Sequence, residues 1–390
     1  MKLARLNELN LQHKRVLMRQ DFNVPLSQGR ITSEARILAA LPSIQYALDQ
    51  SASVILLSHL GRPPEGIDSP EYSLAPVASC LERHLKRPVR FIRDWLNGIH
   101  LQANEVVLCE NVRMQIGEQA NDPVLARKMA ALCDVFVMDA FAVAHRTAAS
   151  TVGIIRYAAQ VCAGLLLQAE LDHLSKALEN PKRPRVALVG GAKVSTKLQL
   201  LSSLITHVDK LLLGGGIANT FLAAQNQAIG NSLYEPALLA EAARLCSLAH
   251  TQACEIVLPE DVIVAPAMTD NPAARRMLSD IQASDQIFDI GPLAAQRYAQ
   301  HLKTAGTILW NGPVGVFEQP AFQQGTATIA SAMADNTGFS IAGGGDTLAA
   351  IEHYAIADKI SYISTGGGAF LAFLEGKPLA AVQALLDRAL

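Results

Sequence analysis

Residues 185–197 read RVALVGGAKVSTK, and this stretch contains the pattern that decides the fold. A short, mostly apolar run leads directly into two glycines, and a helical pattern begins soon after them. This order is typical of a buried parallel strand that turns into a crossover helix. Lys193 and Lys197 follow the glycines, so the turn is a candidate phosphate site. It is not a P-loop, because Ala192 stands where that motif requires a glycine before the lysine.

The two lysines are four residues apart, which places them on one face if the segment is helical. Like charges at this spacing repel each other, and positive charge in a first helical turn opposes the helix dipole. This small cost indicates that an anion is held there. The alternative is a pair of solvated surface lysines.

The same alternation of apolar runs and helical patterns extends along the chain. The runs expected to form strands are 15–18, 53–58, 105–109, 135–139, 185–189, 210–213, 255–259, 306–310, 338–342 and 361–365. The segments expected to form helices are 33–50, 73–86, 122–132, 195–206, 217–225, 236–252 and 346–356. Alternation of this kind predicts an α/β protein with parallel sheets and helices on both faces.

The length and composition predict a soluble protein of two domains. A chain of 390 residues is longer than one core usually organises, and 50% hydrophobic residues exclude disorder. The net charge is −2 and no basic segment stands out, so we expect no nucleic-acid partner. No apolar run reaches the length of a membrane span, and no secretory signal is visible. We therefore expect no membrane partner and a cytoplasmic location, which six cysteines without a C-x-x-C pair also fit.

One segment between the two halves reads as their connection. Residues 157–183 have the pattern of a long helix, which Pro181 and Pro184 would end.

Basic and polar side chains follow the strands of the first half. Ligands bind beyond the carboxyl ends of parallel strands, so these groups are expected to converge. They are Arg19, Asp21, Asn23, His59, Arg62, Arg113, His145 and Arg146, with Arg36 at the start of the first helix. Each arginine alone reads as a solvated charge, and His59 alone reads as a packing residue. Together they predict a site for a small polyanion, because guanidinium groups bind carboxylate and phosphate in a bidentate manner.

Glycines follow the strands of the second half instead. They are Gly190, Gly191, Gly214, Gly215, Gly216, Gly312, Gly315, Gly343, Gly344, Gly345, Gly366, Gly367 and Gly368. Glycine lets a ligand approach the backbone, and helix N-termini favour anions, so these turns predict a bound nucleotide. Asp346 follows the third cluster and is expected either to bind a magnesium ion or to cap a helix.

Seven motifs now stand in order along the chain, and with them the sequence resembles the phosphoglycerate kinase family. The motifs are DFNVP (21–25), SHLGRP (58–63), ENVR (110–113), GGAKVSTK (190–197), LWNGPVGVFE (309–318), GGGDT (343–347) and STGGGAF (364–370). The resemblance implies reversible phosphoryl transfer between 1,3-bisphosphoglycerate and MgADP, giving 3-phosphoglycerate and MgATP. It implies a monomer with two doubly wound, Rossmann-like domains, separated by a cleft that closes about a hinge.

The resemblance also implies domain boundaries and residue roles. The triose-binding domain would comprise 1–165 and the returning tail 372–390, the hinge 166–183, and the nucleotide-binding domain 184–371. The residues implied to bind 3-phosphoglycerate are Asp21, Phe22, Asn23, Arg36, His59, Leu60, Gly61, Arg62, Arg113 and Arg146. Those implied to bind the nucleotide are Lys197, Gly214, Gly215, Asn311, Glu318, Gly344, Gly345, Asp346 and Thr347, with Asp346 on Mg²⁺. Arg36, Lys193, Gly366 and Gly367 would surround the phosphoryl group during transfer.

The chain departs from the family pattern in one motif. Where the family has GTAHRAHAS, this sequence reads AVAHRTAAS, so Ala142 and Val143 replace glycine and threonine, and Ala148 replaces the second histidine. We expect altered affinity for the triose or an altered response to anions, and retained chemistry.

Two other functions are weighed against this interpretation. An NAD-dependent oxidoreductase would need G-x-G-x-x-G, but GGGIAN has Asn219 at the third glycine position. A non-catalytic nucleotide-binding relative would be expected to lose Lys193, Arg36 or the glycine triplets, which are all present. The acceptor in the ATP-consuming direction is a carboxylate of pKa near ~4, so no general base is needed and catalysis rests on positioning and charge.

Overall fold

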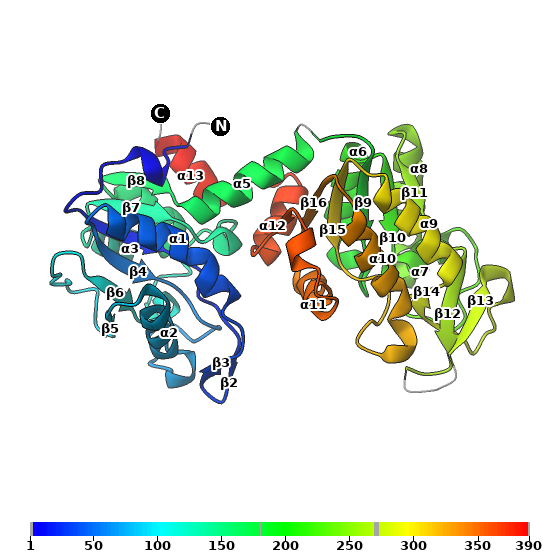
Figure 1. The fold of residues 1–390 in the computed structure, drawn as a ribbon, viewed down its shortest axis with the longest axis horizontal. Coiled ribbons are helices and arrows are strands. Elements are labelled where there is room, and N and C mark those ends of the chain that lie inside the picture. The colour runs from blue at the N-terminus through cyan, green and yellow to red at the C-terminus, as the bar shows by residue number, and fades with distance from the viewer. Residues whose placement is uncertain (1–2, 180, 269–272, 389–390) are drawn as a thin grey trace. The chain divides into compact units, whose positions relative to one another are not determined.

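The computed structural model describes residues 3–179, 181–268 and 273–388. Some residues of the predicted domains lie outside the described residues. These are 1–2 of the predicted triose-binding domain, 389–390 of its returning tail, and residue 180 of the predicted hinge. The chain divides into two compact units, Met1–Asp172 with Pro378–Leu390 (unit 1) and His173–Lys377 (unit 2). Helix α5 (Leu165–Leu178) crosses the division, inside the segment predicted to connect the halves (Figure 1).

Unit 1 is built on a six-stranded parallel sheet in the order β5-β6-β4-β1-β7-β8. Its strands are β1 (Arg15–Arg19), β4 (Ser53–Leu57), β5 (Val89–Ile92), β6 (Val106–Cys109), β7 (Val135–Met138) and β8 (Gln160–Ala163). A small hairpin, β2 (Leu26–Ser27) and β3 (Arg30–Ile31), follows β1. The inner strands are apolar because both faces of the sheet are covered.

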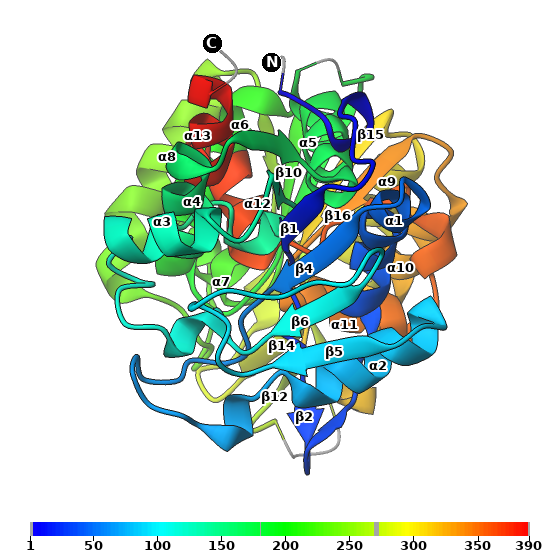
Figure 2. The same ribbon diagram turned by 90° about the vertical axis from the view of Figure 1, so that its left-hand side faces the viewer.

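Alternate residues along these strands pack against different layers of helices. Val16, Met18, Val54 and Leu56 share one core with α1 (Ala35–Asp49) and α2 (Ala75–Leu85). Helices α3 (Pro123–Ala130), α4 (Ile154–Tyr157) and the C-terminal α13 (Ala380–Arg388) lie on the other side of the sheet (Figure 2). Helix α13 packs on α4 and β8, so the C-terminal segment belongs to unit 1.

Unit 2 is built on a second six-stranded parallel sheet, in the order β11-β10-β9-β15-β16-β17. Its strands are β9 (Arg185–Val189), β10 (Lys210–Leu213), β11 (Glu255–Val257), β15 (Thr307–Asn311), β16 (Phe339–Ala342) and β17 (Tyr362–Ile363). One face packs on α9 (Pro292–Lys303), α10 (Gln324–Asp335) and α11 (Gly345–His353). Helices α6 (Leu198–His207), α7 (Gly215–Ala224), α8 (Leu239–Thr251) and α12 (Gly367–Leu374) complete the unit.

The predicted α/β class with two parallel sheets is confirmed, and each predicted apolar run forms a strand. The sequence did not reveal the antiparallel sheet of β12 (Asp261–Ala265), β13 (Ala274–Met277) and β14 (Gln286–Ile290). Strands β13 and β14 carry charged residues such as Arg275 and Asp289, so they lack a continuous apolar run. Strand β12 does contain an apolar run, 262–265, but it was not predicted as a strand. Among the described helices, none has the length and apolarity that a membrane span requires.

Two local predictions are wrong. The long helix predicted from residue 157 begins at Leu165, because Gln160–Ala163 instead pair with β7 as the edge strand β8. Lys193 and Lys197 do not share a helical face either. Lys193 has extended backbone before a 3-10 turn, Val194–Thr196, and Lys197 precedes the first residue of α6.

Candidate active site

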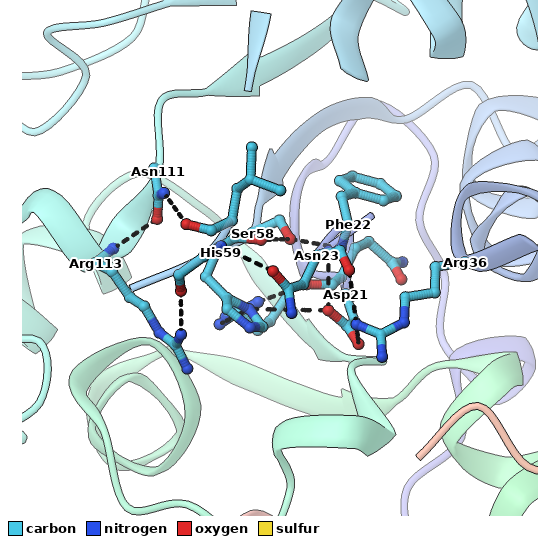
Figure 3. Close-up of polar contacts among 12 residues, drawn as sticks. Asp21, Phe22, Asn23, Arg36, Ser58, His59, Asn111 and Arg113 are labelled. Atoms are coloured by element: carbon cyan, nitrogen blue, oxygen red, sulfur yellow. Dashed lines mark hydrogen bonds and ion pairs between the residues drawn. The ribbon is translucent and has the colours of Figure 1, made fainter. Parts of the chain in front are cut away.

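The polar residues of unit 1 gather at the carboxyl ends of four neighbouring strands. In the sheet order, β6, β4, β1 and β7 lie side by side, and the loops that follow them carry the predicted triose-binding residues. Figure 3 shows several of these side chains pointing toward one another above the sheet. The predicted convergence in unit 1 is therefore present.

Asp21 organises the loop after β1. Its Oδ2 lies 3.0 Å from Nη1 of Arg36, and its Oδ1 accepts a hydrogen bond of 3.1 Å from the Asn23 amide (Figure 3). Nη1 of Arg36 also donates to the Asn23 carbonyl at 2.9 Å. Phe22, which stands between Asp21 and Asn23 in the sequence, is buried, and its amide donates to Ser58 Oγ at 2.7 Å. These contacts fix the direction of the Arg36 guanidinium.

The loop after β4 is held against the same residues. Gly61 has φ +59°, and its amide donates to Asn23 Oδ1 at 2.8 Å. The Leu60 carbonyl accepts from Nδ2 of Asn111 at 2.7 Å, and the Gly61 carbonyl accepts from the Arg113 guanidinium. A Cβ at Gly61 would meet the Tyr72 ring at 2.2 Å, so only glycine fits this turn.

The histidines contribute little charge to this group. His59 is 3% exposed, and its pKa lies well below the ordinary value because of burial and the nearby Arg19 and Arg113. Burial and the neighbouring Arg146 likewise lower the pKa of His145. His59 is therefore neutral at neutral pH, and the positive charge of the site comes from its arginines.

A pocket of about 530 Å³ opens beside these loops within unit 1. Its charged lining consists of Arg19, Arg62, Arg113, Arg146 and Glu118. Burial and the other arginines lower the pKa of Arg113 to about 10, so it stays protonated at neutral pH. Burial raises the pKa of Glu118, against the attraction of Arg19. The charged lining thus consists of four arginines and one buried carboxyl group.

In unit 2 the glycine turns follow the neighbouring strands β10, β9, β15, β16 and β17. The turns after β9 and β15 touch each other, and a Cβ at Gly190 would lie 1.7 Å from the Pro313 carbonyl oxygen. Gly214 precedes α7, and the Gly215 amide donates to the Val314 carbonyl at 3.1 Å. Glycine is required here for close packing of backbone on backbone.

Lys197 is a partly buried cation at this edge. Its Nζ donates to the carbonyl of Gly190 at 2.6 Å and to that of Asn311 at 3.1 Å. Burial lowers its pKa to about 8, although the negative charge of Asp346 favours the protonated form. Lys193, by contrast, is exposed. The two lysines thus have different environments, although they are close in sequence.

The turn after β16 is fixed by side chains of its neighbours. Nδ2 of Asn311 donates to the Gly343 carbonyl at 2.7 Å, and Oγ1 of Thr347 accepts from the Gly312 amide at 2.7 Å. Oδ1 of Asn311 is buried and has no hydrogen-bond partner among the described residues. Gly344 has φ +102°, and Gly345 and Asp346, which begin α11, are exposed.

Three other predicted residues, Gly366, Glu318 and Gly367, differ in exposure and contacts. Gly366 is buried, and its amide donates to Ser364 Oγ at 3.1 Å, so this donor is engaged in this structure. Glu318 is exposed and follows β15 by several residues. Gly367 begins α12 with φ +29°, and a Cβ there would meet nothing within 4 Å.

Comparison with known proteins identifies the family. The protein-family model described as phosphoglycerate kinase matches residues 6–377 of this chain. The chain belongs to the phosphoglycerate kinase family. It is 50% identical to phosphoglycerate kinase from Coxiella burnetii, with a TM-score of 0.96 and 100% of both chains covered. It is 31% identical to the phosphoglycerate kinase from Pyrococcus horikoshii OT3, with a TM-score of 0.81 and 98% of both chains covered.

Membership defines the reaction. A phosphoglycerate kinase transfers a phosphoryl group between a nucleotide and the carboxyl group of phosphoglycerate in glycolysis, so the predicted enzyme class is confirmed. The predicted roles of single residues are a separate matter, and they stay predictions. The structure gathers them into two groups, one at the sheet edge of each unit.

Part of the pocket lining was not predicted from the sequence. Glu118 and Thr151 line the pocket, and Ser150 binds Glu118 through its amide at 2.9 Å. Ser150 ends the stretch AVAHRTAAS, and Thr151 follows it in the helical turn Ala149–Gly153, so the sequence offered a signal for both. Glu118 lies in a turn outside the quoted motifs, and only the fold brings it to the site. Ala148, the departure from the family pattern, also lines the pocket, whereas Ala142 does not.

Proposed function

We propose that the pocket of unit 1 binds 3-phosphoglycerate and 1,3-bisphosphoglycerate. The observation that carries this proposal is the lining of Arg19, Arg62, Arg113 and Arg146 around a volume of about 530 Å³. The guanidinium groups of Arg62, Arg113 and Arg146 would supply bidentate donors for phosphate and carboxylate oxygens. Arg19 is buried and its nitrogens contact Ser150, Gln20 and His59, so it would contribute charge. Asp21 and Asn23 would hold Arg36 and the Gly61 turn in place for the ligand.

The nucleotide is proposed to bind at the glycine turns of unit 2. Lys197 would bind its phosphates, because a cation whose pKa burial has lowered to about 8 gains from an anionic partner. The amides of Gly344 and Gly345 and the hydroxyl of Thr347 lie at the same helix start. Gly214 and Gly215 would line the adenine site, Asn311 would support the phosphate turn, and Glu318 would bind the ribose.

Transfer itself is proposed to depend on charge and positioning. The attacking carboxylate is ionised at neutral pH, since its pKa is near ~4, and it needs no general base. Arg36 and Lys193 would neutralise the phosphoryl group in transit, and the amides of Gly366 and Gly367 would donate to its oxygens. The Gly366 amide would have to leave Ser364 to do so.

Magnesium is proposed to enter with the nucleotide. Asp346 lies exposed in the first turn of α11, and one carboxylate suits an ion that nucleotide phosphates and water mainly hold. Among the described residues, no group of three or more potential metal ligands includes Asp346. Bound there, the ion would supply positive charge that offsets the charge of the phosphates.

We also propose a hinge, domain boundaries, an oligomeric state and a location for the enzyme. The two ligands would bind on different units, so direct transfer requires a movement that brings the ligands together. We propose that this movement occurs about a hinge at 166–183. We propose a monomeric cytoplasmic enzyme whose triose-binding domain is 1–165 with 372–390 and whose nucleotide-binding domain is 184–371. One chain would then carry both half-sites.

A coupled assay of ATP-dependent phosphorylation of 3-phosphoglycerate tests the proposal. We expect turnover that requires Mg²⁺ and saturates in both substrates. Arg113→Ala should raise the Michaelis constant for 3-phosphoglycerate and leave that for ATP unchanged. Equal changes in both constants would overturn the assignment of the pocket to the triose.

A further inference from the structure

A cluster of three metal-ligating side chains lies in unit 1, outside the residues assigned above. It consists of Glu34, Cys80 and His84, whose ligand atoms all lie within 4.8 Å of one another. It is the single group of its kind found among the described residues. The kinase reaction has no evident use for it.

The fold brings these side chains together from two helices. Cys80 and His84 are four residues apart on α2, so they share one face of that helix. Glu34 is the N-cap residue of α1, and its Oε2 lies 2.7 Å from Nε2 of His84. Cys80 is 4% exposed, whereas Glu34 and His84 are partly exposed, so the cluster opens to solvent on one side.

A positive group already occupies the cluster. Nη2 of Arg83 donates to Oε1 of Glu34 at 2.6 Å and to Sγ of Cys80 at 3.2 Å. The Arg83 side chain is 62% exposed, so it can turn into solvent without disturbing the core. The cluster is therefore suited to a cation, and the present occupant is replaceable.

We propose that Glu34, Cys80 and His84 bind one zinc ion. Thiolate, imidazole and carboxylate form a ligand set that zinc accepts, whereas magnesium and calcium prefer oxygen ligands. Zinc ligands in a tetrahedral site lie roughly 3–4 Å apart, which small side-chain rotations can reach from the present positions. On binding, the Cys80 sulfur–hydrogen bond is lost, its proton goes to solvent, and water completes the coordination.

Zinc and cobalt binding to the whole chain tests this proposal. Protein freed of metal with a chelator is titrated with Zn²⁺ in the absence of nucleotide, and separately with Co²⁺. We expect one equivalent of zinc per chain, and a sulfur-to-metal charge-transfer band with cobalt. Zinc should also raise the unfolding temperature, because an ion that binds the folded state stabilises it.

Matched variants locate the ion. Cys80→Ala should abolish the cobalt band, and His84→Asn should remove the zinc-dependent rise in unfolding temperature. Arg83→Gln should tighten zinc binding by about tenfold, because a competing positive charge is lost. Cys246→Ser, which changes a partly exposed thiol of unit 2, should leave zinc binding unchanged.

The proposal is overturned if no stoichiometric zinc binds, or if binding survives both Cys80→Ala and His84→Asn. Loss of binding in Cys246→Ser would place the ion elsewhere and overturn it too. His84 is partly exposed, so His84→Asn still decides the question if removal of the buried Cys80 thiol prevents folding.

Discussion

Lys197 shows how one side chain can combine burial with a charge. Its ammonium group is held by the carbonyls of Gly190 and Asn311, and burial lowers its pKa to about 8. The two backbone carbonyls accept two of its three N–H donors without neutralising the charge. The charge is therefore kept for an anion, which is the proposed nucleotide.

The lowered pKa of Lys197 predicts a pH-dependent affinity for ADP. Lys197 is protonated below about pH 8 and loses its charge as the pH rises through that value, so affinity should fall between pH 7 and 9. Calorimetric titration across this range measures the change. Lys197→Met should bind ADP weakly and without this dependence, and Lys303→Met, a surface control, should behave as wild type. An affinity that stays constant from pH 7 to 9 would remove Lys197 from phosphate binding.

Lys193 is exposed and follows the same turn, so we expect it to act in turnover more than in binding. Lys193→Ala should lower kcat by ~10²–10³, the typical loss of one donor to a transition state. The dissociation constant for ADP should change little. Steady-state kinetics combined with equilibrium binding separate the two effects, and equal losses in both would contradict the assignment.

Ala148 lines the pocket in place of the family's histidine. Ala148→His adds a polar group to the lining, so the Michaelis constant for 3-phosphoglycerate should change while that for ATP does not. Steady-state kinetics at varied 3-phosphoglycerate concentration measure the change in this Michaelis constant. The matched control is Ala142→Gly, a second departure from the family pattern that lies outside the pocket lining. If Ala148→His matches wild type, the position is neutral in this chain.

At the scale of elements, the glycine turns of unit 2 depend on close backbone packing. A Cβ at Gly190 would lie 1.7 Å from the Pro313 carbonyl oxygen, whereas one at Gly345 would meet nothing within 4 Å. Both glycines were predicted from the sequence for the same reason, their place after a strand. The structure separates a glycine needed for the fold from one that leaves space for a ligand.

This difference predicts effects of different size on stability. Gly190→Ala should lower the free energy of unfolding by ~3 kcal/mol, since the clash involves backbone that cannot move aside. Gly345→Ala should change it by less than ~1 kcal/mol, because alanine favours a helix start at an open position. Urea unfolding followed by Trp310 fluorescence, in a Trp95→Phe background, reports on unit 2 alone. Similar effects of both substitutions would contradict the packing account.

The elements also show what the sequence can and cannot predict. Buried parallel strands such as 185–189 are continuous apolar runs, so their places and the residues after them were predictable. Arg62 and Arg113 were expected to converge because parallel strands end at one edge of the sheet. The antiparallel strands β13 and β14 and the start of α5 were not predicted, since tertiary pairing overrides weak local patterns there. The apolar run 262–265 of β12 was a signal that the sequence did offer. Glu118 lies at the pocket for the same tertiary reason.

At the scale of the whole molecule, the chain carries two α/β units with different chemistry. Unit 1 presents arginines at its sheet edge, and unit 2 presents glycine turns and Lys197. Membership of the phosphoglycerate kinase family gives the reaction that joins them. We propose that unit 1 contributes Arg36 to a transfer whose nucleotide is bound by unit 2.

The turnover number of Arg36→Ala tests this claim most directly. Asp21 orients Arg36 at 3.0 Å, so loss of the guanidinium should remove charge from the phosphoryl group in transit. The account predicts that kcat for ATP-dependent phosphorylation of 3-phosphoglycerate falls by ~10²–10³, with ADP affinity unchanged because its site is on unit 2. A near-normal kcat in Arg36→Ala would contradict the account.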